Sequence, residues 1–175
     1  LVRLRERGLE QNTIVVFASD NGGYIGIDQK AGQTVPVTNN APLRSGKGSC
    51  YEGGIRVPLI VRWPGRTVKK AESDEPVVVM DLFPTLLAAA GVIPPDDVTI
   101  DGLNLTPLLR DPTATLDREA LYFHYPHYHH STPGGAIRAG DWKLIEFFDD
   151  GRLELYNLKD DIGEKNNLAE EFPQQ

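Results

Sequence analysis

The chain has little cysteine, few basic residues and no long apolar run. Cys50 is the only cysteine among 175 residues, so an intrachain disulfide is impossible. The apolar runs are much shorter than the roughly 20 residues that a membrane-spanning helix needs. Lys and Arg number 18 against 25 Asp and Glu, which gives a net charge of -7. This acidic balance argues against nucleic acid or an anionic membrane surface as a partner.

The composition is otherwise that of a folded globular protein, with 40% hydrophobic and 25% charged residues. Strand-like and helix-like segments alternate up to Gly91, which predicts part of a mostly parallel α/β sheet. Beyond Arg118 the pattern is rich in strands, and Asp150-Gly151 predicts the turn of a hairpin. We therefore expect a main α/β domain over residues 1–110 and a small antiparallel β/α subdomain over residues 111–175.

The first part of the chain contains three strand-like segments. Residues 13–19 and 57–63 are short apolar runs between turn residues, a pattern typical of strands that are buried on both faces. Residues 77–80 are the third candidate strand. A helix is expected to follow, because Asp81 suits its beginning and Gly91 suits its end. The glycine-rich and proline-containing stretch between residues 21 and 42 predicts a long loop of the active-site type.

Two potential metal ligands follow the first of these strands directly. The apolar run ends in Asp20, Asn21, Gly22 and Gly23. In open α/β sheets, ligands bind just beyond the carboxyl ends of the strands. Carboxylate and carboxamide oxygens are the hard ligands that Ca²⁺ and Mg²⁺ prefer. Asp20 and Asn21 therefore predict half of a cation site.

A lysine between two glycines is the second candidate for chemistry. Gly46 and Gly48 flank Lys47 and allow the backbone to approach a ligand closely. The ammonium group is a compact point charge that suits a tetrahedral oxyanion. A phosphate-binding P-loop is excluded, because its first glycine is missing at the required spacing and no strand precedes the segment directly. A solvated lysine in a flexible turn remains the alternative.

Three charged residues lie close to Lys47 in the sequence. Arg44 either faces the same anion or braces the loop. Glu52 and Arg56 flank two glycines, and we expect a local ion pair between them that shapes the loop.

Four histidines lie within residues 124–130. No cysteine or carboxylate accompanies them at the spacing of a structural zinc site. A loop rich in His and Tyr suits sugar recognition, because its rings stack on a pyranose and its nitrogens bind hydroxyl or sulfate oxygens. We rank a substrate-binding rim that includes His124 and His127 first, packing second and metal binding third.

Together these segments resemble the sulfatase family of the alkaline phosphatase superfamily. The resemblance covers nearly the whole chain, in the family's order. The matching motifs are Asp20-Asn21-Gly22, residues 43–58 (LRSGKGSCYEGGIRVP), residues 81–87 (DLFPTLL), residues 136–144 (AIRAGDWKL) and residues 154–161 (ELYNLKDD).

The resemblance implies roles for three residues. Asp20 and Asn21 match two ligands of the family's Ca²⁺ ion, whereas related zinc or manganese phosphodiesterases place a histidine beside the aspartate. Lys47 matches the lysine that contacts the sulfate and the leaving-group oxygen. The family's nucleophile is a formylglycine made within a Cys/Ser-x-Pro/Ala-x-Arg motif. This sequence lacks that motif, and Cys50 stands in a different context.

The resemblance also implies what surrounds the chain. We expect the C-terminal portion of a sulfatase, with a partial alkaline-phosphatase-like sheet and no turnover by itself. Its expected partners are the N-terminal part of the same enzyme, which supplies the formylglycine, and a sulfated small molecule or saccharide. The parent enzyme is expected to be exported and to hydrolyse sulfate esters of carbohydrate or aryl groups. The alternatives are a phosphodiesterase or phosphonate hydrolase of the same superfamily and a non-catalytic carbohydrate-binding homologue.

Overall fold

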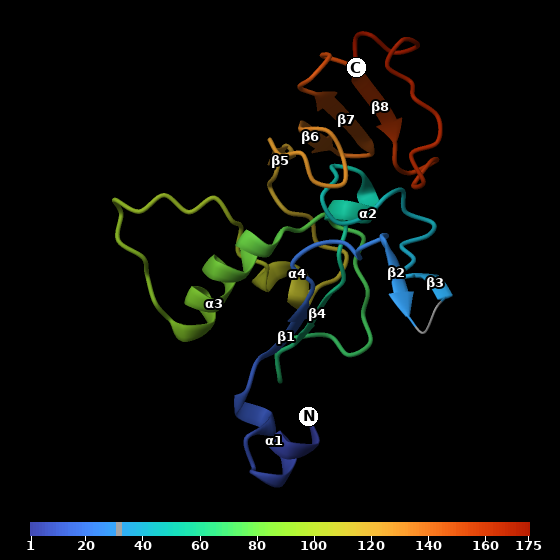
Figure 1. Cartoon of the computed structure of the whole chain (residues 1–175). Coiled ribbons are helices and arrows are strands. Elements are labelled where there is room, and N and C mark those ends of the chain that lie inside the picture. Colours follow the sequence, from blue (N-terminus) through green and yellow to red (C-terminus); the bar gives the residue numbers. More distant parts are fainter. Residues whose placement is uncertain (31–32) are drawn as a thin grey trace. The chain divides into compact units, whose positions relative to one another are not determined.

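The structure is a computed structural model that describes residues 1–30 and 33–175 (Figure 1). Contacts divide the chain into two compact units, and each unit combines two separate stretches of sequence. Unit 1 comprises Leu1–Phe17 and Ile60–Arg118, and unit 2 comprises Ala18–Leu59 and Glu119–Gln175. The expected boundary at residue 110 separates two domains of the complete enzyme, whereas the two units are groups of contacts within this chain. The domain boundary therefore stays a prediction.

Unit 1 is built mainly from short helices and one pair of strands. Strands β1 and β4 pair with each other as a two-stranded sheet. Ile14, Val16 and Trp63 line a small apolar void together with Leu82 and Leu105. The elements are α1 (Val2–Glu6), η1 (Glu10–Asn12), β1 (Val15–Ala18), β4 (Leu59–Arg62), η2 (Val79–Asp81), α3 (Leu82–Ala90) and α4 (Thr106–Arg110).

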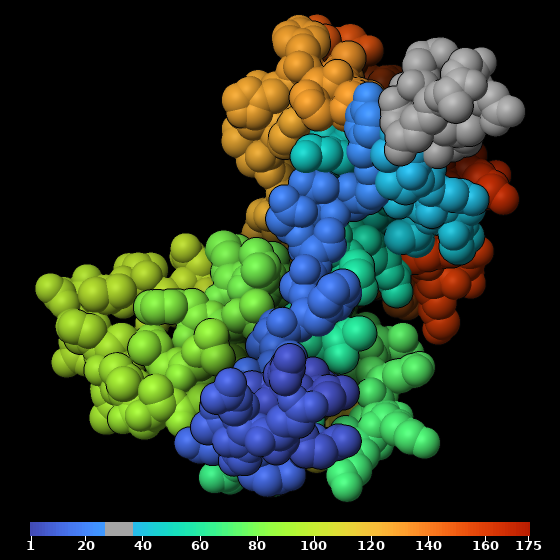
Figure 2. All heavy atoms as spheres, turned by 60° about the horizontal axis from the view of Figure 1, so that its bottom comes forward, coloured from blue at the N-terminus to red at the C-terminus, as the bar shows by residue number. Residues whose placement is uncertain are grey.

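The expectation that residues 13–19 are buried on both faces is wrong. Phe17 is 60% exposed and Ile60, on the paired strand, is 63% exposed. Within the described residues β1 has β4 as its ladder neighbour, and apolar residues of α3 and α4 line a void together with Ile14 and Val16, while Phe17 stays exposed. The segments around α3 appear as green to yellow-green spheres in Figure 2, and this helix also leaves Phe83 exposed.

The expected strand at 77–80 is also wrong, whereas the helix that follows it is confirmed. The Asp81 carboxylate accepts a hydrogen bond from the Val78 N–H at 2.8 Å. This side-chain contact takes a donor that a strand ladder needs, and it favours the tight turn of η2 instead. Helix α3 ends at Gly91, whose φ of 67° is the left-handed conformation that glycine adopts without strain.

Unit 2 contains two antiparallel sheets and one short helix. The larger sheet has the order β5-β6-β7-β8, so each strand pairs with the next one along the chain. The predicted hairpin turn at Asp150-Gly151 is confirmed between β7 and β8. The elements are β2 (Ile27–Lys30), β3 (Gln33–Pro36), α2 (Glu52–Ile55), β5 (Leu121–Tyr125), β6 (Gly134–Ala139), β7 (Trp142–Phe147) and β8 (Leu153–Asn157).

The α/β class is consistent with the structure, but the mostly parallel main sheet is not confirmed. The β2–β3 pair lies in the stretch expected to be a long loop, and it is antiparallel like the four-stranded sheet. Residues 31–32 of that stretch lie outside the described residues. Among the residues that are described, helices are too short and insufficiently apolar to cross a bilayer.

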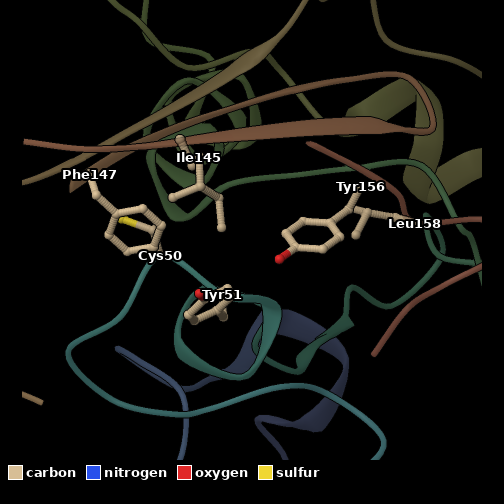
Figure 3. Close-up of a cluster of buried hydrophobic side chains, with 7 residues drawn as sticks. Cys50, Tyr51, Ile145, Phe147, Tyr156 and Leu158 are labelled. Carbon is tan, nitrogen blue, oxygen red and sulfur yellow. The ribbon is translucent and has the colours of Figure 1, made fainter. Parts of the chain in front are cut away.

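The core of unit 2 lies between the four-stranded sheet and the segment that follows Lys47. Side chains on β7 alternate, so Lys143, Ile145 and Phe147 share the buried face while Glu146 is exposed. This face packs on residues 50–52. Figure 3 shows this core cluster, with labels on Cys50, Tyr51, Ile145, Phe147, Tyr156 and Leu158. The segment around Lys47, residues 44–49, is called the Lys47 loop. It continues directly into residues 50–52, which pack on the sheet.

Candidate functional site

The Asp20–Asn21 turn presents two hard oxygen donors. The Ser19 hydroxyl donates to the Asn21 carbonyl oxygen at 2.8 Å, and Asn21 Nδ2 donates to the Gly22 carbonyl oxygen at 2.8 Å. This hydrogen bond holds the side-chain amide of Asn21 in place and leaves its Oδ1 as the atom that can bind a cation. The Asp20 carboxylate next to it is exposed. This donor chemistry fits Ca²⁺ or Mg²⁺. Within the described residues, His, Cys, Asp and Glu side chains form no cluster of three or more that suits a metal ion.

Two backbone hydrogen bonds join this turn to the Lys47 loop. The Gly22 N–H donates to the Gly54 carbonyl oxygen at 2.9 Å, and the Lys47 N–H donates to the Gly23 carbonyl oxygen at 3.1 Å. A Cβ atom at Gly22 would collide with the carbonyl group of Gly53. Glycine is therefore needed for this close approach, which brings the predicted metal ligands and the predicted anion-binding lysine into one substructure of unit 2.

Asn40 is a further element of this substructure, and the sequence reasoning missed it. Its Nδ2 donates to the carbonyl oxygens of Gly23, at 2.8 Å, and Ser45, at 3.0 Å. Ser45 has a φ of 62°, which is unusual for a residue with a side chain. Asn40 thus bridges the two segments and holds a strained residue of the Lys47 loop. Its place in the stretch between residues 21 and 42, which was expected to be a loop, gave no sign of this long-range role.

Arg44 lies in a bracing position. Its guanidinium donates to the Tyr156 hydroxyl at 2.9 Å and to the Glu164 carbonyl oxygen at 2.8 Å. It also lies 4.0 Å from the centre of the Tyr51 ring. These contacts correspond to the loop-bracing alternative, and the anion-facing alternative for Arg44 stays a prediction.

The two tyrosines beside Arg44 share one carboxylate. The Tyr51 and Tyr156 hydroxyls both donate to Glu154 Oε2, at 2.7 and 2.6 Å. Burial, followed by the Glu154 carboxylate, raises the pKa of both tyrosines. Both hydroxyls therefore remain protonated donors and hold the loop segment against β8.

A buried ion network lies beneath the loop. Lys143 Nζ lies 2.9 Å from Glu52 Oε1 and 2.8 Å from Glu164 Oε1. The expected pair between Glu52 and Arg56 is present at 3.7 Å, on the other Glu52 oxygen. Lys143 and Glu164 were missed by the sequence reasoning. The signal was available for Lys143, because strand alternation places it on the same face as Ile145.

The structure brings His129 and His130, rather than His124 and His127, to the Lys47 loop. Gly48, with a φ of 84°, lies against the His129 ring, and a Cβ atom there would collide with it. The His130 ring lies 4.7 Å from the Tyr24 ring between centres. Figure 2 shows the two segments side by side, with the histidine loop in orange and residues 20–26 in blue.

The other two histidines contact aromatic rings elsewhere in unit 2. The His124 ring lies 5.4 Å from the Phe148 ring, and the His127 ring lies 5.5 Å from the Tyr125 ring. Desolvation, followed by the charges of His129 and Lys47, lowers the pKa of His130. This effect also indicates that His130 lies within electrostatic reach of Lys47.

Comparison with known proteins identifies the family. The family model of the C-terminal part of N-sulphoglucosamine sulphohydrolase matches residues 46–175. A sulfatase of Formosa agariphila is 38% identical over 96% of this chain and 31% of its own length. The chain belongs to the sulfatase family. It corresponds to the C-terminal portion of a sulfatase, as the motifs predict.

Two further sulfatase comparisons agree with this assignment. Human arylsulfatase A is 34% identical over 96% of this chain and 36% of its own length. The solved structure of BT4656 in complex with its substrate D-glucosamine-2-N,6-O-disulfate has a TM-score of 0.75 and 32% identity, over 98% of this chain and 33% of that chain. This sulfatase chain spans about a third of the length of these three proteins. The family-model match includes Lys47, Lys143 and Glu164 but begins after Asp20 and Asn21.

Proposed function

We propose that the sulfatase to which this chain belongs hydrolyses a sulfate ester, with Lys47 as a catalytic and substrate-binding residue. The observation that carries the proposal is the hydrogen-bonded junction between the Asp20–Asn21 turn and the Lys47 loop. It places an exposed ammonium-bearing residue and two hard oxygen donors in one substructure of a sulfatase family member.

The proposed role of Lys47 follows from the charge that develops in ester cleavage. As the bond between sulfur and the leaving oxygen breaks, negative charge grows on that oxygen. A fixed ammonium group stabilises this charge more in the transition state than in the ground state. The hydrogen bond from the Lys47 N–H to Gly23 and the contacts of Asn40 hold the lysine backbone in place. Lys47 thus binds the sulfate and assists departure of the alcohol.

Asp20 and Asn21 are proposed to hold Ca²⁺ in the complete enzyme. When bound, the ion supplies positive charge that attracts and orients the sulfate group. Calcium takes about 6–8 oxygen ligands, so two side chains make only part of its coordination shell. The remaining ligands and the formylglycine nucleophile are proposed to come from the N-terminal part of the same enzyme, which is the main macromolecular partner in this proposal.

The substrate is proposed to be a sulfated saccharide, with an aryl sulfate as the alternative. BT4656, at 32% identity, acts on a disulfated glucosamine, whereas arylsulfatase A is named for aryl esters. The Tyr24, His129 and His130 rings beside the Lys47 loop favour the saccharide, because such rings stack on a pyranose. His124 and His127 are proposed to extend this rim farther from Lys47. Arg44 is proposed to support substrate binding without contacting the substrate, because it braces the Lys47 loop.

The test uses the full-length sulfatase and the variant Lys47→Ala. Loss of one donor that stabilises a transition-state oxyanion typically lowers kcat by about 10²–10³-fold. We expect that loss with 4-nitrophenyl sulfate and with glucosamine 6-O-sulfate, while circular dichroism stays unchanged. Lys69→Ala, at another exposed lysine, is the matched control and should retain activity. Unchanged turnover in Lys47→Ala would remove Lys47 from the site.

The rival hydrolase activities are tested in the same preparation. Hydrolysis of bis(4-nitrophenyl) phosphate at a higher kcat/KM than either sulfate ester would favour a phosphodiesterase. Saccharide binding without hydrolysis of any ester would favour a carbohydrate-binding homologue.

A further inference from the structure

The ion network beneath the Lys47 loop ties together three segments that lie far apart in the sequence. Lys143 lies on β7, Glu52 begins α2, and Glu164 follows β8. The Lys143 ammonium bridges one oxygen of each carboxylate, at 2.9 and 2.8 Å. The second Glu164 oxygen accepts the Glu52 backbone N–H at 2.7 Å. Glu164 therefore contacts both the side chain of Lys143 and the backbone of α2.

This network is poorly suited to a role in stability alone. The three side chains are at most 2% exposed, so each charge has lost its hydration. Glu52 Oε2 has no hydrogen-bond partner among the described residues, and the Arg56 guanidinium lies 3.7 Å away. Glu164 also has a φ of 51°, a conformation that costs energy for a residue with a side chain. Apolar residues of the same volume often stabilise such a position better than buried ion pairs do.

The network fixes α2, and α2 fixes both sides of the candidate site. The Gly54 carbonyl oxygen accepts the Gly22 N–H, next to Asn21, at 2.9 Å. The Gly53 N–H donates to the Arg44 carbonyl oxygen, three residues before Lys47, at 2.8 Å. Both contacts join backbone atoms directly, so no flexible side chain can absorb a shift of α2. A movement of Glu52 is therefore transmitted to both segments.

We propose that Lys143 is a positioning residue which, through Glu52 and Glu164, sets the placement of Lys47 relative to Asp20 and Asn21. Lys143 is completely buried, so its ammonium group is not exposed to a substrate in solution. Its compact ammonium bonds both carboxylates at once, whereas the planar guanidinium of arginine requires more space and a different geometry. The inference rests on the proposed sulfatase function of Lys47.

The test compares Lys143→Met with the parent in the full-length sulfatase. Methionine keeps the length of the side chain and removes its charge. We expect a folded enzyme whose kcat for 4-nitrophenyl sulfate falls at least about tenfold, since small misplacements of catalytic groups are costly. KM should change by less than about threefold, because a small displacement weakens the sulfate contact of Lys47 less than it weakens stabilisation of the charge that develops in the transition state. Lys159→Met, at an exposed lysine, is the matched control.

A triple variant separates positioning from stability. Lys143→Met combined with Glu52→Gln and Glu164→Gln removes all three charges of this network, so we expect its melting temperature to rise above that of Lys143→Met. Its kcat should remain low, because the contacts that hold α2 are still absent. Recovery of both quantities, or a kcat in folded Lys143→Met within twofold of the parent, would overturn the proposal. If Lys143→Met does not fold, the milder Glu164→Gln is assayed against the same thresholds.

Amide hydrogen exchange gives a readout that is independent of activity. In Lys143→Met, exchange should accelerate at the N–H groups of Gly22, Lys47 and Gly53 and stay unchanged on β5 and β6. If the N–H groups of Gly22, Lys47 and Gly53 exchange at the same rate in Lys143→Met and in the parent, the proposal is overturned. A parent enzyme without sulfatase activity would instead refute the proposed function, while the exchange result still decides whether Lys143 positions the loop.

Discussion

Replacing Arg44 distinguishes its two possible roles, which are bracing the Lys47 loop and contacting the sulfate of a substrate. We consider Arg44→Met, which keeps the apolar stem and removes the guanidinium. The guanidinium makes two hydrogen bonds, to the Tyr156 hydroxyl at 2.9 Å and the Glu164 carbonyl oxygen at 2.8 Å, and it lies 4.0 Å from the Tyr51 ring centre. The ion pair with Glu154, at 3.8 Å, adds little at a partly exposed position.

The expected loss of stability follows from these contacts. Hydrogen bonds from a charged donor contribute roughly 1.5 kcal/mol each at the lower end of their range. Stacking on an aromatic ring adds about 0.5–1 kcal/mol at exposed sites. The side chain is 40% exposed, so solvent screening reduces the total. We therefore expect Arg44→Met to lower the free energy of unfolding by about 2–3 kcal/mol. At about 2–4 °C per kcal/mol for a chain of this size, the melting temperature should fall by roughly 4–12 °C.

Urea denaturation measures this change. Trp142 lies on β7, in the same unit as Arg44, whereas Trp63 lies in unit 1. In a Trp63→Phe background, tryptophan fluorescence therefore reports the unfolding of unit 2. Arg66→Met, at an exposed arginine, is the matched control. A loss below about 1 kcal/mol, equal to that of the control, would refute bracing. A raised KM for an aryl sulfate together with unchanged stability would instead support contact between Arg44 and the sulfate.

Two further predictions concern buried carboxylates. Asp81 is completely buried, accepts backbone N–H groups including that of Leu103 and pairs with Arg118. Asp81→Ala leaves these donors unpaired and should lower the free energy of unfolding by about 3–5 kcal/mol. Urea denaturation followed by Trp63 fluorescence measures this change, and a loss below about 1 kcal/mol would contradict the prediction. Burial raises the pKa of Glu164 above its ordinary value of 4.5. A carboxyl with a raised folded-state pKa contributes stability below its unfolded pKa and loses it as the pH rises through the folded value. Stability relative to Glu164→Gln should therefore fall as the pH rises above 4.5, and a rise would refute the assignment.

Local sequence signals predicted the parts of the fold that depend on local chemistry. The helix from Asp81 to Gly91 and the hairpin turn at Asp150-Gly151 follow from capping and turn preferences of single residues. The junction of the Asp20–Asn21 turn with the Lys47 loop was expected only through the family resemblance. No local pattern indicates that the Gly22 N–H meets the Gly54 carbonyl oxygen.

The features that sequence reasoning missed depend on long-range pairing. Glu52 and Lys143 are 91 positions apart, and their contact requires α2 to pack on the buried face of β7. The position of the histidines in residues 126–130 was also unpredictable from the sequence, although here the pairing partner is a neighbouring loop. Strand β5 ends at Tyr125, so the path of the following turn, rather than residue type, decides that His129 reaches Gly48.

The charges around the loop explain why Lys47 stands out from its neighbours. In an acidic chain, basic side chains are readily neutralised, and Arg44 and Arg56 both lie close to internal carboxylates. Lys47 forms no ion pair within the described residues, and its side chain is exposed. Desolvation and the nearby charges of His129 and Lys47 lower the pKa of His130, which disfavours a second positive charge beside Lys47. We therefore expect attraction of a sulfate to this part of the chain to depend on Lys47 together with the cation proposed at Asp20 and Asn21, and we expect the buried network to hold Lys47 in position.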